Sequence, residues 1–327
     1  MEYVRLGSSG LKVSRVCLGC MSFGNAREWM VETEDARKVI KKALDLGVNF
    51  FDTANVYSRG RSEEILGEVL KDVREDVVIA TKVFGAMGEK PNQRGLSRKH
   101  IMHQAGESMR RLGTDYIDLY QIHRWDYETP IEETLSTLMD LVRQGRVRYI
   151  GASSMWAWQF AKSLHVSDKH GYERFISMQN VYNLLYREEE REMIPLCKSE
   201  GIGLIPWSPT AAGVLSGKYL KEGRLVVTES DIDRLRPNTP DYKIYIEPPE
   251  NAEIVGRVVK IAQEKGLKPA QIALAWLYHK GVTSPIIGTT KPEHVEEAVE
   301  ALEVELSEDE IRRLEEPYRP KPVFGHR

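Results

Sequence analysis

The sequence has few cysteines and no long apolar segment. Three of its 327 residues are cysteines, too few for a disulfide framework. No apolar stretch approaches about 18 residues, the length that a membrane-spanning helix needs. The first ten residues, MEYVRLGSSG, carry charges and lack the apolar centre of a signal peptide. We therefore expect a cytoplasmic protein without a membrane anchor.

The sequence also has no large excess of charge of one sign. Its 46 basic and 49 acidic residues give a formal net charge of −3. Binding to nucleic acid or to an anionic membrane usually requires a clear positive surplus, so we expect neither partner. The chain is 41% hydrophobic and 29% charged, which is typical of a globular protein that buries a large core. This composition leaves the oligomeric state open.

Two of the cysteines, Cys17 and Cys20, form a C-x-x-C pattern that redox and metal sites also use. They lie in the apolar run VCLGCM, which has the character of a strand, and residues three apart in a strand point to opposite faces. No second cysteine pair or nearby histidine completes a zinc site. We interpret both as packing residues in a reducing compartment.

Short apolar runs alternate with helical patterns along the chain, which is typical of βαβ units and a parallel sheet. Eight such runs occur, at 15–20, 48–53, 77–83, 117–123, 149–153, 175–180, 202–208 and 284–289. Most are apolar throughout, as in strands that are buried on both faces. The pattern predicts one α/β domain over 1–327 with the (β/α)8 TIM-barrel fold. An open, doubly wound sheet is the alternative.

Two segments fall outside this alternation. Residues 3–14 place Ser-Gly between two short alternating runs, which predicts a β-hairpin that closes the lower end of the barrel. Residues 217–250 lack periodicity and hold four prolines, so we expect a long loop there. Among the helices, Ser97 is the predicted start of one that Gly113 ends, and Thr129 is the predicted cap of another.

Ionisable side chains interrupt three consecutive apolar runs at their ends. Asp52 ends VNFFD, Lys82 ends VVIATK and His123 ends IDLYQIH. In a barrel these ends meet at the face that carries the active site, and Tyr57 follows Asp52 in the loop above it. Each residue alone has an ordinary explanation as a turn cap, surface lysine, core histidine or loop aromatic. Their coincidence on one face favours a functional site.

The four side chains suit proton transfer to a developing alkoxide. A lysine buried beside a tyrosine lowers the tyrosine pKa from about 10 toward neutrality. Asp52 would neutralise Lys82 and hold it in place, and His123 would donate to or orient a substrate oxygen. The set contains no thiol nucleophile and too few carboxylates for a glycosidase or a two-metal site. The pattern predicts carbonyl reduction.

The chain resembles the aldo-keto reductases in consecutive blocks that span nearly its whole length. In the family's order these blocks are GVNFFDTANVYSRGRSEEILGEVL, IATKVF, DLYQIHRWD, RYIGASS, SMQNVYN, IPWSPTAAGVLSGKY and PIIGTTKPEHVEEAVEAL. QIHRWD and GASSM are nearest the bacterial and fungal branch that includes aryl-alcohol dehydrogenase-like members. The resemblance implies an oxidoreductase that reduces aldehydes or ketones to alcohols by direct hydride transfer. It implies NADPH as cofactor, with NADH possible, and no metal.

The resemblance also assigns roles to single residues. It implies that Asp52, Tyr57, Lys82 and His123 form a catalytic tetrad with Tyr57 as the proton donor. Ser153 and Gln179 match the groups that hold the nicotinamide carboxamide, and Ser154 stands where many members have Asn. Trp207 matches the aromatic residue that stacks on the nicotinamide ring.

Two further blocks match the phosphate-binding parts of the family. The pyrophosphate block supplies Ser208, Thr210, Gly213, Leu215 and Lys218. The segment around the adenosine 2′-phosphate supplies Gly288, Thr290, Lys291, His294 and Glu297. Thr210 replaces a usual Leu, and Lys291 and His294 replace common Arg and Gln patterns. A phosphate there would meet the N-terminus of the last barrel helix.

A substrate pocket is expected at the same face of the barrel. Its candidate residues are Met21, Phe23, Phe84, Trp125 and Trp156. Several aromatic rings favour an aryl or medium-sized aldehyde, so the expected partner is a small carbonyl compound. Arg59, Arg61 and Arg124 lie near the same rim and would attract a phosphorylated or carboxylated substrate. The physiological substrate stays open.

A function of a different class also stays open. The β subunits of potassium channels share this fold and tetrad while acting as cofactor-binding regulatory proteins. Turnover of a generic aldehyde would separate that alternative from an enzyme.

Overall fold

Eight parallel strands form the central sheet of the computed structural model, which describes residues 1–228, 235 and 240–326. The strands follow the order β12-β3-β4-β5-β6-β7-β8-β9. Their bounds are β3 (Cys17–Gly19), β4 (Phe50–Asp52), β5 (Val78–Val83), β6 (Ile117–Ile122), β7 (Val147–Ser153), β8 (Ser177–Gln179), β9 (Gly203–Leu204) and β12 (Ile286–Gly288). Each of the eight predicted apolar runs overlaps one of these strands.

The two edges of the sheet meet through backbone hydrogen bonds. The N–H groups of Thr283 and Ser284 donate to the Leu204 carbonyl at 2.9 and 3.2 Å. The N–H of Ile286 donates to the Pro206 carbonyl at 2.9 Å. These bonds join β9 to the start of β12, so the strands form the predicted barrel rather than an open sheet.

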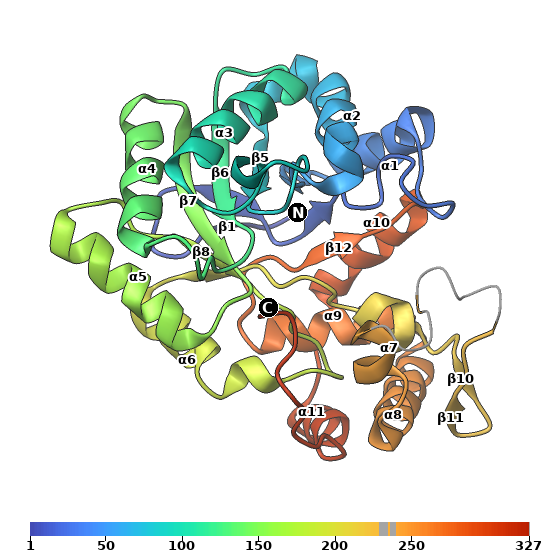
Figure 1. The fold of residues 1–327 in the computed structure, drawn as a ribbon. Coiled ribbons are helices and arrows are strands. Elements are labelled where there is room, and N and C mark those ends of the chain that lie inside the picture. Colours follow the sequence, from blue (N-terminus) through green and yellow to red (C-terminus); the bar gives the residue numbers. More distant parts are fainter. Residues whose placement is uncertain (229–234, 236–239, 327) are drawn as a thin grey trace.

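Helices surround the strands as an outer layer (Figure 1). Their bounds are α1 (Thr33–Asp45), α2 (Arg61–Leu70), α3 (Arg98–Leu112), α4 (Ile131–Arg143), α5 (Ala157–His170), α6 (Met193–Glu200), α8 (Pro249–Lys265), α9 (Pro269–His279), α10 (Pro292–Glu300) and α11 (Glu308–Glu315). In α1 the apolar stripe that includes Val39 and Ile40 is buried, and it shares one core with Phe51 on the outer face of β4. Within the described ranges, no helix is both long and apolar enough to cross a bilayer.

Helix limits follow local hydrogen bonding. The Ser97 side chain caps α3 as predicted, and Gly113 follows the helix with a left-handed φ of 63°. The predicted cap Thr129 instead donates to Asp126 Oδ2 at 2.8 Å. Pro130 is therefore the N-cap of α4, which has no side-chain cap.

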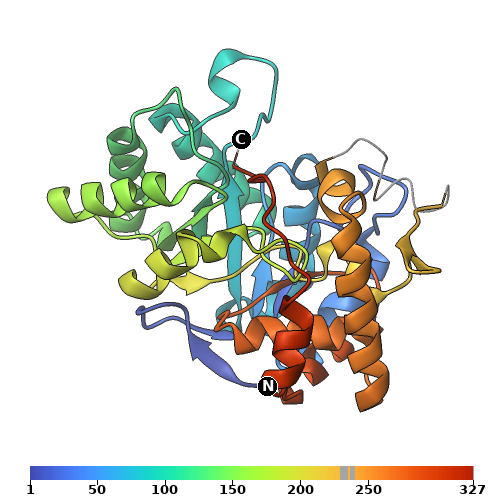
Figure 2. The ribbon, with the colours of Figure 1, turned by 90° about the horizontal axis from the view of Figure 1, so that it is seen from below.

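The predicted N-terminal hairpin closes the lower end of the barrel. Strand β1 (Tyr3–Arg5) pairs antiparallel with β2 (Lys12–Ser14). Leu6 and Val13 are fully buried in the inner core, where they join Phe50 and other inward side chains of the strands. Figure 2 shows the hairpin at one end of the strands and the C-terminus at the other.

The segment 217–250 contains more regular structure than predicted. It includes a short hairpin of β10 (Leu220–Lys221) and β11 (Arg224–Leu225), followed by α7 (Pro240–Tyr245). Of the described prolines in this segment, Pro240 begins α7, and Pro248 and Pro249 are the N-cap and first residue of α8, because the fixed φ of proline suits the first helical turn. Part of the segment lies outside the described residues, namely 229–234 and 236–239.

The two C-x-x-C cysteines pack on opposite sides of the sheet, as predicted. Cys17 belongs to the core inside the barrel, whereas Cys20 belongs to the core between strands and helices. Burial raises the pKa of both thiols well above the ordinary value. Both therefore stay protonated and lack the thiolate character of redox or metal-binding cysteines.

Candidate active site

Strand alternation turns two of the predicted catalytic side chains into the barrel. Phe50 and Ala80 belong to the inner core, and Asp52 and Lys82 lie two residues beyond them on the same faces of β4 and β5. Asp52 is 2% exposed and Lys82 is fully buried. Two ionisable groups at this depth require partners.

Lys82 connects the aspartate to the tyrosine. Its ammonium group forms an ion pair with Asp52 Oδ1 and donates to the Thr53 carbonyl at 2.8 Å and to the Tyr57 hydroxyl at 3.3 Å. These contacts use all three of its donors. Burial lowers the pKa of Lys82, but Asp52 and Tyr57 more than compensate and raise it above the ordinary value. The lysine therefore stays charged.

The second oxygen of Asp52 has two amide donors. Gln121 Nε2 donates to Oδ2 at 2.9 Å and Gln179 Nε2 donates to the same atom at 2.8 Å, and the two amides are bonded to each other at 3.0 Å. Gln121 was not predicted as a site residue. Its signal was present, because it is a polar interruption two positions before His123 in IDLYQIH.

Tyr57 and His123 complete the cluster above the strand ends. Tyr57 begins a short 3-10 turn, η1 (Tyr57–Gly60), in which Ser58 and Arg59 adopt left-handed φ angles of 47° and 54°. Its ring contacts His123 edge-on, with centroids 5.9 Å apart. The structure thus brings all four predicted tetrad residues together.

The electrostatics of this cluster differ from the sequence-based expectation at Tyr57. Burial raises the pKa of Tyr57 above its ordinary value of 10, and Lys82 offsets only part of that increase. The expected lowering toward neutrality is therefore wrong for this state of the site. Burial, followed by Lys82 and Arg124, lowers the pKa of His123 well below its ordinary value. At neutral pH the phenol is protonated and the imidazole is neutral.

A cavity of about 330 Å³ opens above the tetrad. It borders Asp52, Tyr57 and His123 of the tetrad. Of the other predicted site residues, it is lined by Met21, Ser153, Gln179, Trp207, Ser208, Thr210 and Gly288. Lining residues without a predicted role in the site are Gly19, Pro209, Ala212, Asp241 and Ile286, and Arg124 lines it as well.

The indole of Trp207 is held at its edge. Its Nε1 donates to Ser154 Oγ at 3.1 Å, and the Ser154 N–H donates to Asn180 Oδ1 at 2.8 Å. The Phe324 ring meets the indole edge-on, with centroids 5.9 Å apart. Ser154 is therefore engaged in positioning Trp207 and does not line the cavity, whereas Ser153 does.

Three predicted pyrophosphate-binding residues do not line the cavity. The N–H groups of Gly213 and Leu215 both donate to the Thr210 carbonyl, at 3.0 and 3.2 Å, within the turn η5 (Ala211–Ser216). The Leu215 side chain is fully buried in the core. The Lys218 ammonium lies over its neighbouring tyrosine ring. The tight turn thus uses these amides internally.

The predicted 2′-phosphate segment surrounds the start of α10. Lys291 is the exposed N-cap residue, and its N–H donates to Thr289 Oγ1 at 2.9 Å. The Thr289 hydroxyl also contacts His294 Nδ1 at 3.0 Å. Thr290, between Thr289 and Lys291 in the sequence, is half-buried. Glu297 forms an ion pair with Lys268.

Most of the predicted substrate-pocket residues lie away from the cavity. Phe23 is fully buried in the core, so its predicted place in the substrate pocket is wrong. Phe84 and Trp125 pack against the same core. Trp156 is exposed and meets His326 of the C-terminal segment edge-on, with centroids 4.9 Å apart. Met21 alone of the five lines the cavity.

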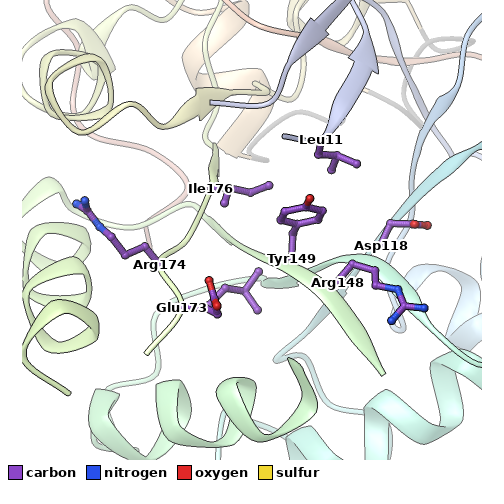
Figure 3. A pocket seen from close by; sticks show the side chains of 8 residues that line it. Leu11, Asp118, Arg148, Tyr149, Glu173, Arg174 and Ile176 are labelled. Atoms are coloured by element: carbon purple, nitrogen blue, oxygen red, sulfur yellow. The ribbon is translucent and has the colours of Figure 1, made fainter. Parts of the chain in front are cut away.

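A second cavity, of about 480 Å³, lies beside the N-terminal hairpin, remote from the tetrad. Figure 3 shows the Tyr149 ring near Leu11, with Arg148 and Arg174 extending away on opposite sides. One of its two carboxylates, Asp118, already pairs with Arg74 at 2.7 Å and accepts a backbone N–H at 2.9 Å. The cavity above the tetrad is therefore the candidate active site.

Comparisons with known proteins show the family of the chain. The profile of the aldo/keto reductase family matches residues 15–319. A Saccharomyces cerevisiae protein named as an aryl-alcohol dehydrogenase (AAD16) is 43% identical over 346 residues, covering 98% of both chains. The versiconal hemiacetal acetate reductase of Aspergillus parasiticus is 42% identical over 350 residues, covering 99% of this chain and 98% of its own. The chain therefore belongs to the aldo/keto reductase family.

Proposed function

We propose that this oxidoreductase reduces aldehydes or ketones to alcohols with NADPH, and that Tyr57 donates the proton. The observation that carries the proposal is the bridge made by Lys82, which joins Asp52 to the Tyr57 hydroxyl at the floor of the cavity. A charged lysine 3.3 Å from a phenol has the geometry to stabilise the phenolate that proton donation leaves behind.

The residues of the cavity fit a dinucleotide. The indole of Trp207 offers a flat face, and Ser153 and Gln179 offer polar atoms beside it. Gly288 has open space where a side chain would stand. We assign the nicotinamide to Trp207, Ser153 and Gln179, and the phosphates to the wall from Ser208 to Thr210 and the start of α10. When bound, the reduced cofactor supplies the hydride.

The side chains of the tetrad then divide the remaining chemistry. Neutral His123 donates a hydrogen bond that orients the substrate oxygen beside Tyr57. The Tyr57 hydroxyl transfers its proton to that oxygen as it becomes an alkoxide. Lys82 stabilises the resulting phenolate, and Asp52 keeps the lysine in place. The raised pKa of Tyr57 keeps the phenol protonated until it is used.

A preference for NADPH over NADH is supported by charge near α10. Lys291 is exposed at the helix N-terminus, which favours a phosphate dianion. The neighbouring Glu296 and Glu297 are paired with Lys42 and Lys268, so their charges are partly neutralised. Residues 288–297 contain no arginine for a bidentate phosphate contact. We therefore expect a moderate preference, about ten- to a hundredfold in kcat/KM.

A panel of aldehydes and ketones with NADPH and NADH, followed by the loss of cofactor absorbance, tests the proposal. Aryl aldehydes come first, because relatives at 42–43% identity include one named as an aryl-alcohol dehydrogenase and one named as a reductase. Turnover that Tyr57→Phe abolishes supports the proposal. Cofactor binding without turnover of any carbonyl would contradict it and would favour a regulatory role.

A further inference from the structure

Few charged groups lie near Tyr57 and His123, the tetrad residues that would contact a substrate oxygen. The charges that influence the pKa of Tyr57 come from Lys82, Asp52 and Arg124. Those that influence the pKa of His123 come from Lys82 and Arg124. Lys82 and Asp52 neutralise each other as an ion pair, so Arg124 and Asp241 are the charged side chains that remain in the cavity wall.

Arg124 is fixed in the wall beside the tetrad. It follows His123 directly, and its Nη1 donates to the His123 carbonyl at 2.6 Å. The half-buried side chain lines the cavity together with Tyr57 and His123. Burial lowers the pKa of its guanidinium, and the only compensating group is Tyr57. Across the part of the chain that the structure describes, no carboxylate forms an ion pair with it.

The other two arginines of the predicted rim are not equivalent to Arg124. Arg61 is paired with Glu32 at 3.4 Å and with Glu64 at 3.3 Å. Arg59 is exposed and does not line the cavity. Of the three arginines predicted to attract an anionic substrate, Arg124 is therefore the one that lines the cavity.

The acidic group in the cavity wall outside the tetrad is Asp241. Asp241 of α7 influences the pKa of Tyr245. The pKa of the Arg124 guanidinium responds to burial and to Tyr57 but not to Asp241. Asp241 therefore does not neutralise Arg124.

We propose that Arg124 determines substrate specificity, and that the carbonyl compounds used best carry a carboxylate that its guanidinium binds. A guanidinium presents a planar fork of N–H donors that matches a carboxylate with two parallel hydrogen bonds. Its location beside Tyr57 would hold such a substrate with the carbonyl at the tetrad. This inference rests on the proposed carbonyl reduction and names its substrate class.

The test compares 2-, 3- and 4-carboxybenzaldehyde with their methyl esters, which keep the shape but lack the charge. For at least one acid, the wild type should have a higher kcat/KM than for its ester. Arg124→Met should lower kcat/KM for that acid by about ten- to a hundredfold, the range for one hydrogen bond to a charged group. The loss of kcat/KM for the ester should be at least about tenfold smaller, because any effect of Arg124 on Tyr57 and His123 is common to both substrates. Arg124→Lys, which keeps the charge without the fork, should fall between the two.

Arg59→Met is the matched control, because it removes one positive charge from the same rim without touching the cavity wall. It should change neither substrate series by more than about twofold, since an exposed charge is screened by salt. Equal losses for acid and ester in Arg124→Met, or no preference for any acid in the wild type, would overturn the inference. Ester turnover in that case would leave the proposed function intact, whereas absence of turnover for both series would count against the proposed function itself.

Discussion

Replacing Lys82 with methionine removes one half of a buried ion pair. Lys82 is fully buried and Asp52 is 2% exposed, so the carboxylate would remain inside the barrel without its cation. Loss of one partner from such a pair lowers the free energy of unfolding by about 3–5 kcal/mol. Gln121 and Gln179 would still donate to Asp52 Oδ2 at 2.9 and 2.8 Å. We therefore expect a loss near the lower end, about 3 kcal/mol.

A double-mutant cycle with Asp52→Asn measures the coupling directly. The double variant replaces both charges with neutral groups, so its destabilisation should be smaller than the sum of the single losses by at least about 2 kcal/mol. Urea denaturation followed by circular dichroism supplies the four free energies of unfolding. Strictly additive losses would refute the reasoning, because they would mean that the two charges do not stabilise each other.

Three further predictions concern catalysis, cofactor choice and pH. Tyr57→Phe should lower kcat by at least about a hundredfold while NADPH binding, measured by fluorescence titration, is retained; a variant with a third of the wild-type turnover would contradict the assignment. Lys291→Ala should raise KM for NADPH by about tenfold and leave NADH kinetics nearly unchanged, and an equal change for both cofactors would argue against a phosphate contact. The pKa of His123 is held well below 6.5, so below that pH the unfolded chain binds a proton that the native chain does not. The free energy of unfolding should therefore fall as the pH drops below about 6.5, and His123→Gln should weaken that dependence in urea titrations; an identical dependence in both proteins would speak against it.

Strand geometry made the positions of Asp52, Lys82 and His123 predictable from the sequence. A side chain at the C-terminal end of a buried parallel strand must lie at one known end of the barrel. Strand alternation then decides whether it points inward. Asp52 and Lys82 satisfied both conditions, and so did Gln121, which was overlooked because an amide in a strand carries no charge to draw attention.

Residues on the connecting loops were harder to predict. Phe23 and Met21 are two positions apart, yet one is buried in the core and the other is exposed at the cavity. The directions of their side chains depend on the conformation of a turn, where no regular alternation in the sequence predicts which residue points inward. The amides of Gly213 and Leu215 illustrate the same limit, because left-handed φ angles at Ala212 and Gly213 direct them toward the Thr210 carbonyl.

The hydrogen bonds of the Asp52 carboxylate also fix the register of the barrel strands. From β4 it is bonded to Lys82 on β5, Gln121 on β6 and Gln179 on β8, so a slip of one residue in its strand would turn it outward and leave three polar partners buried. A related barrel without catalytic activity would still lose stability if either Asp52 or Lys82 were replaced alone. Their presence in a related sequence is thus weak proof of catalysis. Tyr57 lies on a turn outside the strands, so its retention or loss is the better test of whether such a barrel works as an enzyme.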